Sequence, residues 1–167
     1  MIPETDDTRG VNRIRLLIAV GLVINYAGFF YDWTWHAQNL SITPITPGKL
    51  LTVHGLIYLG ALIVTVATID ALVRRPFTAA VQKYAVWLIA LGLLVEFTGD
   101  ATDMWAHGHG YEKDLYHDLV TIGAALTVVG YLVIELFHLI SRSGPDPVEE
   151  PAESEPAPAP ADPAGRR

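Results

Sequence analysis

Four stretches of the chain are apolar over nearly the length needed to cross a lipid bilayer, and this feature restricts the fold more than any other. They are Leu16 to Tyr31, Leu50 to Leu72, Val81 to Thr98 and Leu119 to Ile140. A helix needs about 20 apolar residues to span the hydrocarbon core, where every backbone N–H and C=O group must be bonded within the segment. The sequence therefore predicts an all-α fold, a bundle of four transmembrane helices.

The chain also carries polar segments at both ends. The apolar stretches place the membrane domain at residues 13–143, after a short N-terminal segment, 1–12. From Gly144 onward acidic residues alternate with Pro and Ala, and this segment, 144–167, carries much of the net charge of −7. It has no apolar face to bury and is expected to be a disordered acidic tail.

Two missing features narrow the range of functions. The chain has no cysteine, which excludes disulfides, thiolate metal ligands and a cysteine nucleophile. It also has no basic patch with interleaved aromatic residues, so nucleic acid is not an expected partner. The lipid bilayer is the expected surrounding, and so small a bundle often works as a homo-oligomer or within a larger membrane complex.

Basic residues are distributed unequally over the connections between the predicted helices. Short loops rich in Lys and Arg remain on the cytoplasmic side. The basic residues near the termini and the second connection are Arg9, Arg13, Arg15, Arg74, Arg75, Lys83 and Arg142, whereas the other two connections hold only Lys49 and Lys113. Both termini are therefore expected in the cytoplasm, with the first and third connections outside a plasma or inner membrane.

An internal repeat relates the two halves of the chain. The segment Leu17 to His36 aligns without a gap to Leu88 to His107. The segment that begins at His54 likewise aligns with the segment that begins at His117. The bundle is therefore predicted to consist of two duplicated helix pairs, about 13–74 and 81–141. Both first helices run outward, so the pairs should be parallel repeats about a pseudo-twofold axis along the membrane normal. Glycines seven residues apart should allow close helix packing, namely Gly21, Gly28, Gly92 and Gly99.

Each half places one Asp and two His residues toward the outer end of the predicted bundle. An Asp and a His four residues apart project from one helical face. Thr46 and Pro47 are expected to begin the second helix, so that His54 lies about two turns into it, level with the Asp and His of the first helix. The six predicted metal ligands are Asp32, His36 and His54 in the first half, and Asp103, His107 and His117 in the second.

Two imidazoles and one carboxylate per half form a ligand set suited to Zn, Fe(II), Mn or Cu(II) rather than to Cu(I). If the halves meet at their axis, the six ligands could instead hold two metals about 3.5 to 4 Å apart. The alternative is a hydrogen-bonded polar network, or interfacial residues near the lipid headgroups. Because burying ionisable groups in a membrane is costly, six of them repeated in register favour metal binding.

A polar stripe continues inward along the third predicted helix. Its members, at positions i, i+4, i+7 and i+11, are Glu96, Asp100, Asp103 and His107. Glu96 and Asp100 are the candidate catalytic residues, as general bases, and the stripe could also supply extra ligands or a path for protons. A purely structural role, in which Glu96 is bonded to Asn25, is the alternative. His109 lies in the following turn and is expected to be exposed.

Glu135 and His138 form an E-x-x-H pattern near the cytoplasmic end of the fourth helix. Di-iron carboxylate bundles use this spacing. Here the pattern occurs once, with only Asp70 as a plausible neighbour. Pairing with arginine or contact with lipid headgroups is the favoured interpretation.

The D-x-x-x-H pattern at the end of one membrane helix, followed by a His near the head of the next, resembles a known ligand motif. It is similar to the copper-site motif in the C subunit of copper membrane monooxygenases, on Asp32, His36 and His54 and again on the corresponding residues of the second half. The resemblance implies copper ligands on the extracytoplasmic side of a protein that handles oxygen or a small reduced substrate. It covers the ligand pattern alone, because this chain is shorter and the His-to-His spacing differs between the halves.

These patterns leave three functions open. The first is a membrane metal enzyme, either an oxidoreductase that uses oxygen or a hydrolase with a metal-bound water, in which the cofactor is Cu, Zn or Fe. The second is a metal-ion carrier or transporter in which the stripe relays ions. The third is a haem protein with His54 and His117 as axial ligands, which leaves the other four polar residues without a role.

Overall fold

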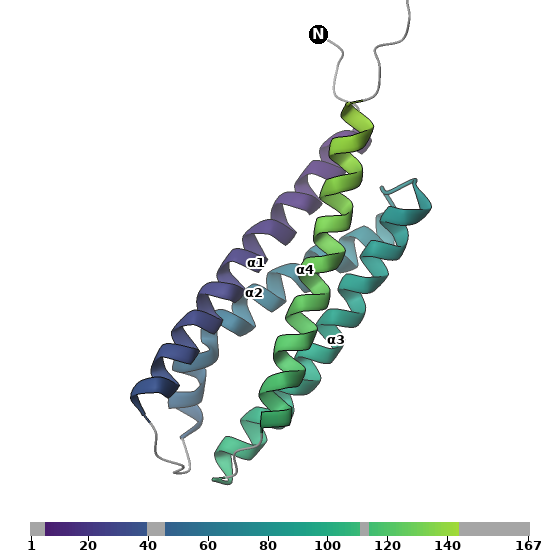
Figure 1. Ribbon diagram of the computed structural model, residues 1–167. Coiled ribbons are helices and arrows are strands. Elements are labelled where there is room, and N and C mark those ends of the chain that lie inside the picture. Colours follow the sequence, from purple (N-terminus) through teal and green to yellow (C-terminus); the bar gives the residue numbers. More distant parts are fainter. Residues whose placement is uncertain (1–5, 40–45, 111–113, 144–167) are drawn as a thin grey trace, which may run out of the picture.

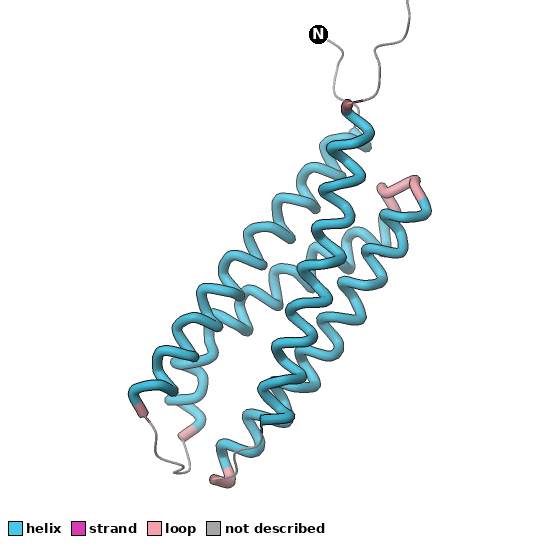
Figure 2. Tube along the Cα trace, viewed as in Figure 1, coloured by secondary structure: helices cyan, strands magenta, loops and turns pink. Residues whose placement is uncertain are grey.

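The computed structural model describes residues 6–39, 46–110 and 114–143, and almost all of them are helical (Figures 1 and 2). The helices are α1 (Asp6–Gln38), α2 (Pro47–Arg74), α3 (Ala80–Gly108) and α4 (Asp114–Arg142). Each of the four is long and apolar enough to cross a membrane, as predicted. Helix α1 begins inside the segment assigned to the N-terminal region, 1–12, and the predicted tail lies outside the described residues.

The boundaries of α2 follow from ordinary capping chemistry. The Thr46 side chain accepts a hydrogen bond from the backbone N–H of Lys49, and Pro47 occupies the first turn, where its missing N–H has no consequence. Both assignments confirm the predicted start. At the other end Arg75 adopts a left-handed conformation, φ 52°, and its N–H bonds the carbonyl of Ala71. His54 is therefore fixed two turns inside the helix.

All four helices extend beyond their apolar stretches. Backbone hydrogen bonding continues through the polar residues, so that His36 and His107 lie in the last turns of α1 and α3 and His117 in the first turn of α4. Because α1 and α3 end where α2 and α4 begin, all three histidines lie at the same end of the bundle, opposite the end at which the described chain starts and finishes (Figure 1). We call this the polar end.

The helices associate as two close pairs, α1 with α2 and α3 with α4, with fewer contacts between the pairs. Glycines permit the close approach. A Cβ atom added to Gly21 would lie 2.6 Å from Val64 Cγ2, and one added to Gly92 would lie 2.5 Å from Thr127 Oγ1. Gly28 and Gly99 face the backbones of Ile57 and Val120 in the same way. The predicted packing role of the four glycines is therefore confirmed.

The bundle buries a group of ionisable side chains at the polar end, whereas it buries apolar side chains along its whole length. The fully buried apolar side chains Ile14, Ile18, Ile89 and Ile134 belong to one cluster at the terminal end. The buried ionisable side chains of the polar end are Asp32, His54, Asp100, Asp103 and His107. The apolar side chains Leu50, Val53, Ile57, Ala106 and Val120 are also buried toward the polar end, so the ionisable groups there need polar partners close by.

An ion pair joins the two helix pairs at the terminal end. Arg15 Nε donates to Glu135 Oε1 at 2.7 Å, a second guanidinium nitrogen contacts Glu135 Oε2, and Arg15 also reaches Asn12. Asp70 is paired elsewhere, with Arg13 at 2.6 Å and Arg74 at 2.5 Å. The expected arginine pairing of Glu135 is confirmed, and this carboxylate is committed to linking α1 with α4.

Replacing Glu135 with Ala should therefore weaken the bundle without altering the polar end. A charged hydrogen bond of this kind contributes about 1.5 to 3 kcal/mol, so the free energy of unfolding should fall by about that amount. Metal content should stay at the wild-type value, because Glu135 follows His117 by 18 residues on α4, about 27 Å along the helix axis. Unfolding in detergent and elemental analysis of the same sample measure both, and metal loss would indicate that the metal binds at the terminal end of the bundle.

Candidate metal centre

The structure brings all six predicted ligands together at the polar end. Asp32 and His36 come from the end of α1, Asp103 and His107 from the end of α3, and His54 and His117 from the first turns of α2 and α4. Four of them are buried, with exposed fractions between 5% and 8%, and His36 and His117 are partly buried. Most of the cluster is therefore shielded from the outer surface of the bundle.

Within each half, the Asp lies between the two His residues of that half. Asp32 Oδ1 is 2.9 Å from His54 Nε2 and 3.4 Å from His36 Nε2. Asp103 Oδ2 is 3.5 Å from His107 Nε2, and its Oδ1 is 3.4 Å from His117 Nδ1. The grouping predicted from the D-x-x-x-H pattern and the following His is thus present in both halves.

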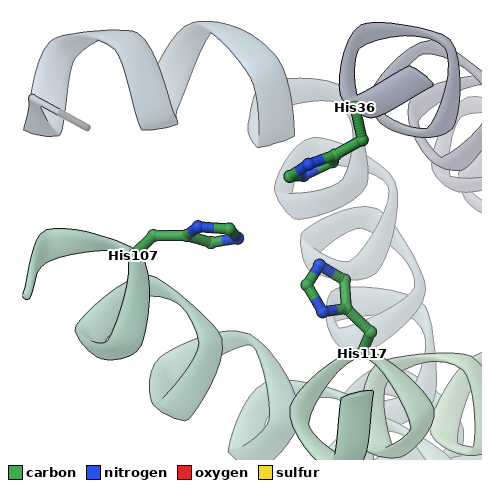
Figure 3. Close-up of side chains that lie close together, drawn as sticks. All are labelled: His36, His107 and His117. Atoms are coloured by element: carbon green, nitrogen blue, oxygen red, sulfur yellow. The ribbon is translucent and has the colours of Figure 1, made fainter. Parts of the chain in front are cut away.

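The two halves meet through His36. Its ring lies 5.3 Å from that of His107 and 5.5 Å from that of His117, measured between centroids, and the latter two rings are 5.6 Å apart. One nitrogen of each of these three histidines lies within 4.8 Å of the others, and a carboxylate oxygen of Asp32 lies equally close to one nitrogen each of His36 and His54. Figure 3 shows the three rings, from α1, α3 and α4, turned toward a common centre. His36 therefore belongs to both groups of candidate ligands.

The chemistry of these atoms fits a bound cation. Asp32 Oδ1 and His107 Nε2 are buried, and within the described chain each lies at ion-pair distance from a neighbour, His54 Nε2 at 2.9 Å and Asp103 Oδ2 at 3.5 Å, without a hydrogen bond of good geometry. A bound cation would supply the partner that such buried, incompletely bonded atoms need. Imidazole nitrogens with carboxylate oxygens suit Zn, Fe(II) or Cu(II).

The candidate catalytic residues Glu96 and Asp100 have different surroundings. Glu96 is 2% exposed, and its Oε1 accepts a hydrogen bond of 2.6 Å from Asn25 Nδ2. This bond is the one expected if Glu96 has a purely structural role. Asp100 is also buried, but it lines the cavity beside the ligands, and its Oδ2 has no hydrogen-bond partner within the described chain. Of the two, Asp100 is the carboxylate that faces the cavity.

A cavity of about 470 Å³ adjoins the cluster. The carboxylate and imidazole side chains that line it are Asp32, His36, His54, Asp100, Asp103 and His117. Five of the six predicted ligands are therefore accessible from one space. Such a volume is in the range of small-molecule sites.

Tyr58 and His109 also lie toward the polar end. Tyr58, which the sequence reasoning missed, places its hydroxyl 3.3 Å from His54 Nδ1 and so orients the ring whose other nitrogen faces Asp32. The sequence signal for Tyr58 was its i, i+4 spacing from His54 on a helix.

His109 is exposed, as expected, with its Nδ1 2.7 Å from the carbonyl of Trp105, and it lies in neither ligand group.

Comparison with known proteins returns no relative: no protein-family model, no characterised protein and no solved structure matches this chain. The likeness to the copper membrane monooxygenase subunit therefore stands on the D-x-x-x-H and His pattern alone.

Proposed function

We propose that this chain is an integral membrane metalloprotein that binds a divalent transition metal, Cu, Zn or Fe, with ligands from both helix pairs. The convergence of His36, His107 and His117 from three helices, with their nitrogens within 4.8 Å of one another, carries the proposal. Asp103 lies beside two of these rings and supplies a carboxylate. Asp32 and His54, with the shared His36, offer a second position for a metal on the other side of the same cluster.

We further infer that the two helix pairs are duplicated units related by a pseudo-twofold axis. Equivalent glycines support this: Gly60 packs on the backbone of Asn25, and its counterpart Gly123 packs on the backbone of Glu96. Asn25 and Glu96 are themselves equivalent in the aligned repeat, and they meet in one hydrogen bond between the halves. A contact between equivalent positions is what a twofold axis produces where it passes between two helices.

The function that we favour is metal-dependent catalysis, as an oxidoreductase if the metal is copper or iron. The cavity leaves room beside the cluster for a substrate, and Asp100 is positioned as a general base. Zinc has no redox chemistry, so with zinc the activity would be hydrolytic, through a metal-bound water. The basic residues around the termini place the polar end outside the cytoplasm in this proposal.

The two other functions receive less support from the geometry. A carrier of metal ions needs ionisable groups along its path, but beyond Glu96 the described residues that are buried carry no ionisable side chain, only apolar ones such as Ile14, Ile18 and Ile89 and the uncharged Thr68, Gln82 and Thr127. A haem between His54 and His117 needs a flat, open space between them. His36 and His107 pack instead against the proposed axial ligands, with ring centroids 5.5 to 6.5 Å apart.

Elemental analysis of protein purified in detergent without chelator tests the proposal. We expect one or two equivalents of a transition metal per chain, and an optical spectrum without a Soret band. A Cu(II) site would add weak visible bands, and zinc would add none. Protein that binds no transition metal, even after incubation with Zn, Cu and Fe salts, would show the cluster to be a polar network.

A further inference from the structure

The cavity beside the metal ligands has apolar side walls that belong mainly to α1 and α4. The wall residues from α1 are Tyr26, Phe29 and Trp33, and those from α4 are Val120, Thr121 and Ala124. These two helices have the fewest contacts of any neighbouring pair in the bundle. They are joined by Arg15 and Glu135 at the terminal end and separate toward the polar end (Figure 1). The cavity occupies the space that this divergence creates.

The mouth of this cavity opens on the lipid-facing surface of the bundle. Tyr26 is 44% exposed, Trp33 is 68% exposed, and Thr121 is exposed on α4. Tyr26 precedes His36 by ten residues, which is about 15 Å along the helix axis. The opening therefore extends from the level of the ligands to the depth of the hydrocarbon core, where the surrounding solvent is acyl chain and not water.

Asp100 adds a carboxyl group to the cavity besides the candidate metal ligands. Asp100 is 9% exposed, it lines the cavity, and its Oδ2 makes no hydrogen bond to any other described residue. A carboxyl oxygen in this position accepts a hydrogen bond from an O–H or N–H group. The same cavity thus combines apolar walls, a free acceptor at its inner side and the metal ligands at its polar end.

From these observations we propose that the cavity binds a lipid-soluble amphiphile that enters from the bilayer between α1 and α4. Its apolar part lies against Tyr26, Phe29 and Val120, and a terminal hydroxyl or amine donates a hydrogen bond to Asp100 next to the metal ligands. The inference deepens the proposed function by naming the substrate class of the same site. Water-soluble substrates of similar size lack the apolar surface that these walls would cover.

Photoaffinity labelling of the full chain in lipid vesicles tests this proposal. The probe is a dodecanol that carries a diazirine on its chain, and adducts are mapped by mass spectrometry. We expect adducts on the cavity walls of α1 and α4, displaced by excess dodecanol and not by dodecane, which has no donor. Asp100→Ala should weaken displacement by dodecanol about tenfold, the usual effect of losing one hydrogen bond to a charged group.

A second variant, which blocks the cavity, tests the proposal even if Asp100→Ala does not fold. Thr121→Trp fills the exposed mouth and should abolish labelling of the walls. Ile122→Trp is its matched control, since Ile122 is the next residue on α4, is 52% exposed and does not line the cavity. Adducts confined to other lipid-facing positions, or equal wall labelling in both tryptophan variants, would overturn the proposal.

Metal content measured on the same samples separates this inference from the proposed function. Thr121 is in neither ligand group, so Thr121→Trp should retain its metal while losing the label. Wild-type protein that holds metal but is not labelled in the cavity refutes the amphiphile site alone. Wild-type protein that is labelled as expected but never holds metal supports the amphiphile site and refutes the metal centre.

Discussion

Replacing His36 with Ala is expected to reduce metal affinity more than any other single substitution at the polar end. His36 is the residue common to both ligand groups, so its loss damages both positions for a metal. Loss of a group that only orients a ligand already costs 10 to 100-fold in affinity, and loss of the ligand itself should cost at least about 100-fold. Competition with a chromogenic chelator measures the affinity.

Other histidines of the cluster and one outside it provide the comparison. His54→Ala and His117→Ala each remove a member of one group, so each should leave the other group able to bind. His109→Ala removes an exposed histidine from the same end of the bundle and should have no effect. Wild-type affinity in His36→Ala would show that the halves bind metal separately or not at all.

Valine at Gly60 or Gly123 is expected to destabilise the bundle strongly. A Cβ at Gly60 would overlap the backbone and the Cβ of Asn25, and one at Gly123 would overlap the backbone of Glu96 and lie 2.6 Å from the carbonyl oxygen of Gly92. Backbone cannot move aside as a side chain does. Each substitution should therefore lower the free energy of unfolding by about 3 kcal/mol or more. It should also lower metal affinity, because it forces apart the helices that bring Asp32 to His54 and Asp103 to His117.

Gly55→Ala is the matched control for these valine variants. Gly55 lies on the same helix as Gly60, and a Cβ there would meet nothing within 4 Å. Alanine is also the better helix former, so stability should stay the same or rise slightly. Equal effects of Gly55→Ala and Gly60→Val in a detergent unfolding titration would contradict the close-packing account.

The helices were the most predictable part of the fold, because their apolar stretches approach membrane length and their caps are local. The start of α2 at Thr46 and Pro47 could be read from the sequence for that reason. Hydropathy did not predict the polar ends of the helices. The apolar stretch of the first helix stops at Tyr31, but α1 continues to Gln38 because helical hydrogen bonding does not depend on side-chain polarity.

The grouping of ligands within each half could also be predicted, since Asp32 and His36 share a helical face and His54 follows a short connection. The joining of the halves through His36 could not. A repeat aligns positions within each unit, but it does not specify how the two interfaces meet. The sequence allowed the hydrogen bond from Asn25 to Glu96 as one of several possible roles for Glu96. A carboxylate within a membrane helix fits a structural, catalytic or relay role equally well.

X-ray absorption at the zinc edge of protein loaded with one equivalent of zinc tests the central claim most directly. If both helix pairs contribute to one centre, the spectrum should show three imidazoles at about 2.0 to 2.1 Å, with carboxylate oxygen completing the shell. Loss of one imidazole should follow in His36→Ala and equally in His107→Ala, whose residues come from different halves. A shell of oxygen atoms with no imidazole scattering, unchanged in both variants, would contradict the account.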